Sequence, residues 1–207
     1  MAGTRAIQVQ RGLYLEYFTI AYNSLEGMIA IGFGLLSGSI ALIGFGLDSV
    51  IEVTSGAALV WRLRADGNVA AREEVERKAL RVVGVCFLAL AVYVTYEAAE
   101  SLLSKEAPRR TIPGIVLAIA SMIVMPWLAR AKRRVAGRIG SSALTADAKQ
   151  TEVCMYLSAI LLAGLLLNAL LGWWWADPVA ALAMVPIIVK EGRTALCGQT
   201  CCATCHG

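Results

Sequence analysis

Six long apolar stretches constrain the fold of this 207-residue chain more than any other feature. They cover about residues 13–36, 40–61, 82–103, 112–128, 142–171 and 178–189. About 20 apolar residues are enough for an α-helix to cross the hydrocarbon core of a bilayer. Since 58% of the residues are hydrophobic and the mean hydropathy is +0.66, little remains for a soluble domain. The sequence therefore predicts an all-α, polytopic membrane protein, folded as a bundle of six transmembrane helices.

The basic residues predict how this bundle is oriented. Lys and Arg gather in the amino-terminal lead, in residues 62–81, in a loop at Arg130–Arg138 and in the tail, whereas the opposite side carries only Lys105, Arg109 and Arg110. Because short loops rich in Lys and Arg stay in the cytoplasm, we expect both termini there and the protein in the cell inner membrane. The net charge of +4 thus reports topology and does not indicate a nucleic-acid partner.

The same pattern divides the chain into three regions. We expect a cytoplasmic lead at residues 1–12, a six-span domain at residues 13–192 and a Cys-rich cytoplasmic tail at residues 193–207. The first apolar stretch is full length and no small-residue cleavage pattern follows it. It is therefore predicted to be an anchor and not a signal peptide.

The second apolar stretch carries two acidic residues in its middle. It reads LIGFGLDSVIEVTSGAAL from Leu42 to Leu59, with Asp48 and Glu52 one helical turn apart on one face. Carboxylates at that depth are costly, and two so close together cannot both stay ionised without a cation. They could be satisfied by basic residues on neighbouring helices. No Lys or Arg lies in the middle of another predicted span, however, which favours an ion site.

The fifth apolar stretch begins with a polar half, LTADAKQTEVCMYLS. Asp147, Gln150 and Cys154 recur there on one helical face. At about 1.5 Å per residue from the cytoplasmic ends of the two spans, Glu52 lies about 14 Å deep and Asp48 about 20 Å, while Gln150 lies about 12 Å deep and Cys154 about 18 Å. If the two helices pack together, Asp48, Glu52, Gln150 and Cys154 are predicted to converge on one ion.

These motifs resemble the membrane domain of the cation diffusion facilitator family of divalent-metal efflux transporters. The resemblance covers about residues 12–192 and rests on the six spans, on Asp48 and Glu52, and on ADAKQTEVC followed by LGWWWADPVAALAM. In that family the fifth span typically reads A-D-A-x-H-x-x-x-D, before a Trp-rich turn and Asp-Pro. The resemblance implies a tetrahedral site between the second and fifth spans and proton-coupled export of metal from the cytoplasm. By analogy it also implies a homodimer.

This chain departs from the family pattern at two positions. The family's His and Asp fall on Gln150 and Cys154, and the chain's one His, His206, lies in the tail. Gln does not titrate near neutral pH, so proton coupling would pass to Asp48, Glu52 and Cys154. A thiolate ligand would favour zinc, cadmium or another soft metal over magnesium or manganese. Cys154 could instead be a small buried hydrophobic residue.

Two further polar groups leave alternatives open. Glu16, Asn23 and Glu26 share a face of the first span, where with Asp147 they could line a water or proton pathway or could form hydrogen bonds between helices. The tail offers Cys197, Cys201, Cys202, Cys205 and His206, either as a soft-metal site or as a chain end that binds metal adventitiously. A disulfide is not expected in a reduced compartment.

The sequence thus predicts a transporter that exports a divalent metal such as zinc or cadmium, with metal and protons as its substrates and without a cofactor. One alternative is a membrane metal-binding or sensor protein that holds an ion without moving it, with the Cys tail as its working part. Another is a structural membrane protein with no ion site. An enzyme is not predicted, because a single His in the tail leaves no Ser-His or Cys-His pair for the spans.

Overall fold

The computed structural model describes residues 2–64, 69–104 and 109–197, and these residues form six α-helices. In chain order they are α1 (Ala2–Ser37), α2 (Ile40–Arg64), α3 (Val69–Ser104), α4 (Ile112–Ile139), α5 (Ser142–Leu171) and α6 (Ala176–Cys197). The described residues contain no β-strand. The predicted all-α fold is confirmed, with a helix at each of the six predicted positions.

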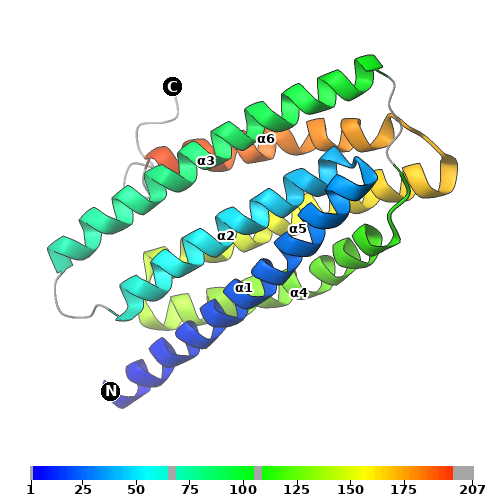
Figure 1. Cartoon of the computed structure of the whole chain (residues 1–207). Helices are drawn as coiled ribbons and strands as arrows, with labels where there is room; N and C mark the ends of the chain where they lie inside the picture. The colour runs from blue at the N-terminus through cyan, green and yellow to red at the C-terminus, as the bar shows by residue number, and fades with distance from the viewer. Residues whose placement is uncertain (1, 65–68, 105–108, 198–207) are drawn as a thin grey trace.

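The helices form a bundle in which successive helices run in opposite directions (Figure 1). α1, α2, α4 and α5 pack around a shared core, while α3 and α6 pair with each other and lie against α2 and α5. α1 begins and α6 ends at the same end of the bundle (Figure 1). That end also holds the turn between α4 and α5. We call it the basic end, because exposed arginines gather there.

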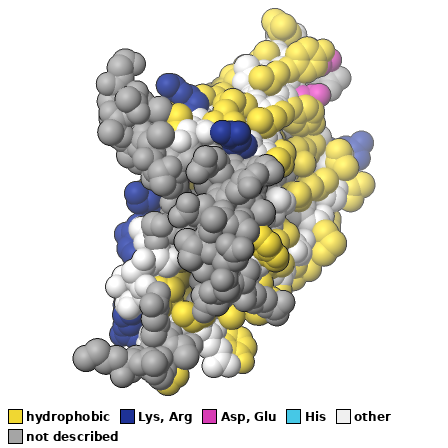
Figure 2. Space-filling model, turned by 90° about the vertical axis from the view of Figure 1, so that its left-hand side faces the viewer, with side chains coloured by type: hydrophobic (Ala, Val, Ile, Leu, Met, Phe, Trp, Pro, Cys, Tyr) yellow, Lys and Arg dark blue, Asp and Glu magenta, His cyan; other side chains and the backbone are white. Residues whose placement is uncertain are grey.

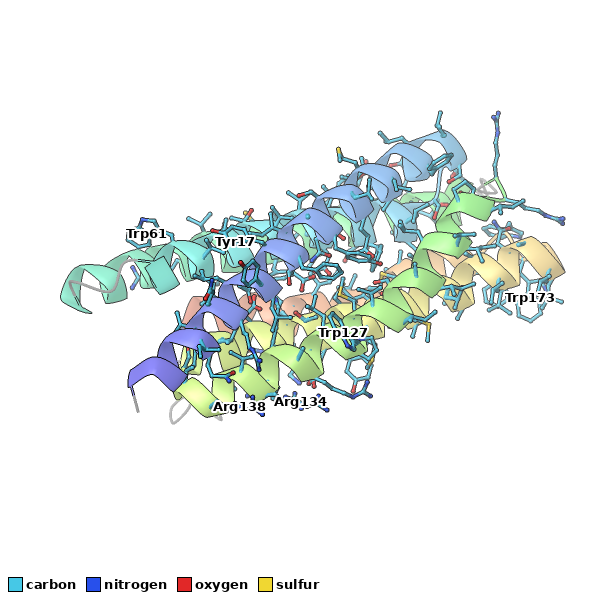
Figure 3. The ribbon with its side chains drawn as sticks, turned by 90° about the horizontal axis from the view of Figure 1, so that it is seen from below. Tyr17, Trp61, Trp127, Arg134, Arg138 and Trp173 are labelled. Carbon is cyan, nitrogen blue, oxygen red and sulfur yellow. The ribbon has the colours of Figure 1, made fainter. Side chains whose placement is uncertain are left out.

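Figure 2 looks onto the basic end and shows Lys and Arg side chains spread over it. Figure 3 shows Arg134 and Arg138 toward this end and Trp173 at the opposite one. Trp173 stacks on Trp175 with ring centroids 4.9 Å apart, in the predicted aromatic turn. Because Trp commonly lies at a membrane interface, this turn fits the headgroup region of one leaflet.

Five of the six helices are long and apolar enough to cross a membrane. The spans are Ile7–Ser37, Ile40–Trp61, Gly84–Ser104, Ile112–Ile139 and Asp147–Leu171. Within the described residues, α6 does not qualify as such a span, because charged residues shorten its apolar part. Asp177 lies at its start, and Lys190, Glu191 and Arg193 lie near its end. It nevertheless packs along α3 inside the bundle. The protein is therefore an integral membrane protein built from a six-helix bundle.

Glycines let the first two helices approach closely. A Cβ atom on Gly46 of α2 would lie 2.9 Å from the backbone nitrogen of Ile31, and one on Gly34 of α1 would lie 3.0 Å from that of Ile43. Gly38 turns the chain between them with a φ of 70°, a conformation that favours glycine. Close backbone contact of this kind stabilises helix pairs in lipid, where no hydrophobic effect drives association.

Local capping signals explain two helix starts. The side chain of Thr111 accepts a hydrogen bond from the backbone nitrogen of Gly114 at 3.2 Å, and Ser141 accepts one from Leu144 at 3.3 Å. Both residues have extended backbone, as expected of N-caps. The predicted starts of the fourth and fifth helices are therefore confirmed.

Asp177 caps a helix other than its own. An Asp directly before a proline is typical of an N-cap of the helix that follows, but α6 already begins at Ala176, before Asp177. The carboxylate of Asp177 instead accepts hydrogen bonds from the Ser39 hydroxyl at 2.5 Å and from the backbone nitrogen of Ile40 at 2.8 Å. It therefore caps α2 and ties the turn before α6 to the turn before α2.

The basic segment Arg130–Arg138 is helical and not a loop, which corrects the prediction. α4 continues through it to Ile139 and ends at Gly140, whose φ is 66°. All four arginines of this segment are exposed, but Lys132 is completely buried. The last turns of α4 therefore carry a charge into the bundle core.

Candidate cation site

The two acidic residues of α2 lie inside the bundle. Asp48 is 4% exposed and Glu52 is 1% exposed. Both face the interior at the interface between α2 and α5, since the hydroxyl of Thr151 on α5 donates a hydrogen bond to Oε1 of Glu52 at 2.9 Å. The acidic face predicted for the second span is therefore directed at the fifth.

Cys154 completes a compact group with these carboxyl groups. It is 1% exposed, and its thiol interacts with both Asp48 and Glu52. Thr151 precedes Cys154 by about one helical turn, so the two side chains share a face of α5. Two carboxyl groups and a thiol thus lie near one another in the protein interior, and these donor types suit a borderline or soft divalent metal.

Gln150 lies beside this group without completing it. Its side chain is partly buried, and its Nε2 atom has no hydrogen-bond partner in the described part of the chain. The same is true of Oε2 of Glu52. Buried polar atoms without partners are uncommon in proteins. A cation bound here would give the Glu52 oxygen a partner, and a rotated Gln150 amide could add its oxygen.

In this conformation the site is not arranged as a finished metal centre. Among the described residues, no group of three or more His, Cys, Asp and Glu side chains is placed to hold a metal ion. Glu52 is directed at Thr151 instead. Binding would therefore need small side-chain rotations that bring the carboxylates and the thiol to one point.

Asp147, the remaining acidic residue of the α5 face, forms an ion pair with Lys132 of α4. Nζ of Lys132 donates to a carboxylate oxygen of Asp147 and, at 3.2 Å, to Oε2 of Glu16. All three side chains are buried, and they join α1, α4 and α5. The prediction placed no Lys or Arg in the middle of another span, but α4 continues past the predicted end at residue 128 and carries Lys132 into the core. Lys132 forms ion pairs with Glu16 and Asp147, and its charge also acts on Glu52.

The predicted polar face of α1 is buried along its length. Oε2 of Glu26 accepts a hydrogen bond from the Ser49 hydroxyl of α2 at 3.0 Å. Both amide atoms of Asn23 are buried and lack partners within the described structure. Farther along α5, the hydroxyl of Ser158 bonds that of Ser121 at 2.9 Å. Polar groups therefore follow one another through the core, from the basic end past Glu52 and beyond.

Sequence reasoning missed Thr151 and Lys132. Thr151 had a usable signal, because Asp147, Thr151, Cys154 and Ser158 recur at helical spacing and form the buried face of α5. Lys132 had none, since it stands among exposed arginines in the sequence. The predicted tail ligands are only partly visible. Cys197 ends α6 and is exposed, whereas Cys201, Cys202, Cys205 and His206 lie outside the described residues.

Comparison with known proteins gives the same broad picture. Residues 18–197 match the family described as the cation efflux transmembrane domain. The chain is 26% identical to the uncharacterized transporter sll1263 of Synechocystis sp. over 162 residues, which is 75% of this chain and 52% of that protein. It is also 26% identical to transmembrane protein 163 of Xenopus laevis over 142 residues, or 67% of this chain and 49% of that one. The chain thus spans about half the length of the curated relatives it matches.

Proposed function

Because this chain belongs to the cation efflux transmembrane domain family, we propose that it transports a divalent cation across the membrane, with the ion bound between α2 and α5. The observation that carries this proposal is the burial of Asp48, Glu52 and Cys154 near one another in the core of a membrane-spanning bundle. Charged and ionisable groups at that depth are costly and typically mark an ion pathway.

The proposed substrate is a soft or borderline metal such as zinc or cadmium. Two carboxylates balance the charge of a divalent ion, and the sulfur of Cys154 adds a soft ligand that zinc and cadmium accept readily. Gln150 supplies a neutral fourth donor at most. A metal that binds the thiolate displaces its proton, so binding here releases protons. This exchange is the basis on which we propose metal–proton antiport.

The proposed direction is export from the cytoplasm, across the cell inner membrane. The exposed arginines of α4, among them Arg130, Arg134 and Arg138, lie toward the end where α1 begins and α6 ends. Loops rich in basic residues remain cytoplasmic, which supports placing both termini there. The homodimer that the family resemblance implies stays a prediction.

Metal flux into proteoliposomes tests the proposal. Wild type is expected to take up Cd²⁺ or Zn²⁺ in exchange for protons when the vesicle lumen is more acidic than the bath, whereas Asp48→Ala and Glu52→Ala are expected to abolish flux. A matched control is Thr54→Ala, which removes an exposed side chain of the same helix. Each variant is first checked for a folded, monodisperse state in detergent. Flux at the wild-type rate in both acidic variants would exclude α2 from the site.

A further inference from the structure

A second group of buried charges lies near the proposed site. Lys132, which is completely buried, stands between the carboxylates of Glu16 and Asp147. The structure places Glu16 close to α2 as well, since a Cβ atom on Gly56 would lie 3.4 Å from Oε2 of Glu16. Four helices therefore surround one ammonium group.

This group has more acceptor capacity than Lys132 uses. Glu16 and Asp147 each bind the ammonium through one oxygen, and their other oxygens, Oε1 and Oδ1, are buried without a hydrogen-bond partner among the described residues. Two carboxyl groups thus face one ammonium group, which binds only two of their four oxygens. An arrangement built only to lock helices together would be expected to satisfy all its buried oxygens.

The group also lies between the proposed site and the basic end. Asp147 precedes Thr151, the partner of Glu52, by one turn of α5. Gly56, which lies against Glu16, follows Glu52 by one turn of α2. Both helices thus place the group one turn nearer to the basic end, about 6 Å along the axis. A cation that enters from this end and follows the buried polar groups meets Glu16 and Asp147 before Glu52.

We propose that Glu16 and Asp147 form a second cation site, which the ammonium group of Lys132 fills in this conformation, and that an entering divalent cation exchanges with that ammonium on its way to Glu52. This inference rests on the proposed transport function. Two carboxylates without a thiol make a hard, oxygen-only site, which accepts Mn²⁺ as readily as softer metals. The long side chain of Lys132 can withdraw its ammonium toward the basic end, as lysines near helix ends do in membranes.

The test measures Mn²⁺ binding to the purified protein in detergent, by the electron paramagnetic resonance signal of the free ion. Lys132→Gln removes the tethered charge and is expected to bind one Mn²⁺ more than wild type. Adding Asp147→Asn to this variant is expected to abolish the extra binding. The control is Arg133→Gln, which removes the same formal charge from the neighbouring position, where the side chain is 52% exposed and pairs with Glu152. It is expected to bind Mn²⁺ as wild type does.

Equal stoichiometry in wild type and Lys132→Gln would overturn the inference, as would extra binding that survives Asp147→Asn. If Lys132→Gln does not fold, Lys132→Arg decides. Its guanidinium binds carboxylates through two parallel hydrogen bonds and exchanges less readily, so Mn²⁺ association in stopped flow is expected to slow at least about fivefold. An unchanged association rate would overturn the inference and show that Lys132 only holds the helices together. These binding measurements need no transport, so they separate failure of this inference from failure of the proposed function.

Discussion

Asp177 gives the most direct test of how the bundle is held together. Its carboxylate is 1% exposed and accepts hydrogen bonds from the Ser39 hydroxyl, from the backbone nitrogen of Ile40 at 2.8 Å and, more weakly, from that of Ala41 at 3.4 Å. Asp177→Ala removes the acceptor of all three. The first turn of α2 then keeps buried N–H groups that no helical carbonyl can reach.

The expected loss of stability follows from these contacts. A buried donor left without a partner costs about 1–3 kcal/mol, and the loss of an N-cap alone costs about 1 kcal/mol. The Ser39 hydroxyl can rotate toward another acceptor and the Ala41 contact is long, so the nitrogen of Ile40 accounts for most of the loss. We expect Asp177→Ala to lower the free energy of unfolding by about 2–4 kcal/mol. Asp177→Asn keeps an acceptor oxygen and is expected to cost about 1 kcal/mol.

Denaturant unfolding in mixed micelles, followed by Trp fluorescence, measures these differences. Val179→Ala is the control, because Val179 lies on the same helix and is 43% exposed, and its change is expected to stay within about 0.5 kcal/mol. The reasoning is refuted if Asp177→Ala is as stable as this control. It is also refuted if Asp177→Asn is as damaging as Asp177→Ala, since the hydrogen bonds would then not be the cause.

Three further predictions concern helix packing and the ion site. Gly46→Ala is expected to destabilise the bundle by about 1–3 kcal/mol, because the new methyl group meets α1, whereas Gly32→Ala, with no atom within 4 Å of the new group, is expected to be neutral or stabilising in the same unfolding assay. Cys154→Asp is expected to shift competitive flux from cadmium toward manganese, and Cys154→Ser to weaken both; an unchanged ratio in both variants would make Cys154 a packing residue. Thr151→Val removes the hydroxyl that orients Glu52 and is expected to weaken metal affinity in equilibrium dialysis by about 10-fold or more. Equal affinity in Thr151→Val and wild type would contradict a role for this hydrogen bond.

The pH dependence of binding offers one more check on Cys154. Metal and proton compete for the same sulfur, so the affinity of wild type for Cd²⁺ is expected to rise with pH. In Cys154→Ser the hydroxyl keeps its proton throughout, and this part of the pH dependence is expected to disappear. Titrations of both proteins at several pH values measure the difference, and identical slopes would show that the thiol does not release its proton to the metal.

The amino-acid sequence by itself determined the helices and the face of α2 that carries the acids. Apolar length predicted the helices because a segment in lipid must satisfy its backbone hydrogen bonds internally. The starts of the fourth and fifth helices could be predicted, because an N-cap such as Thr111 or Ser141 bonds only to residues within its own first turn. Asp48 and Glu52 could be placed on one face because helical geometry fixes that relation between neighbours. These features depend on residues close together in the chain.

Only the tertiary structure decided which partners the buried polar groups find. The sequence around Lys132 is indistinguishable from a basic loop, and the helix carries this residue into the core because Glu16 and Asp147, from two other helices, compensate its charge. Asp177 looks like a cap for its own helix, yet the fold brings the first turn of α2 within its reach. Neither partnership leaves a periodic signal, because the groups that meet are separated by more than a hundred residues between Glu16 and Lys132 and between Ser39 and Asp177.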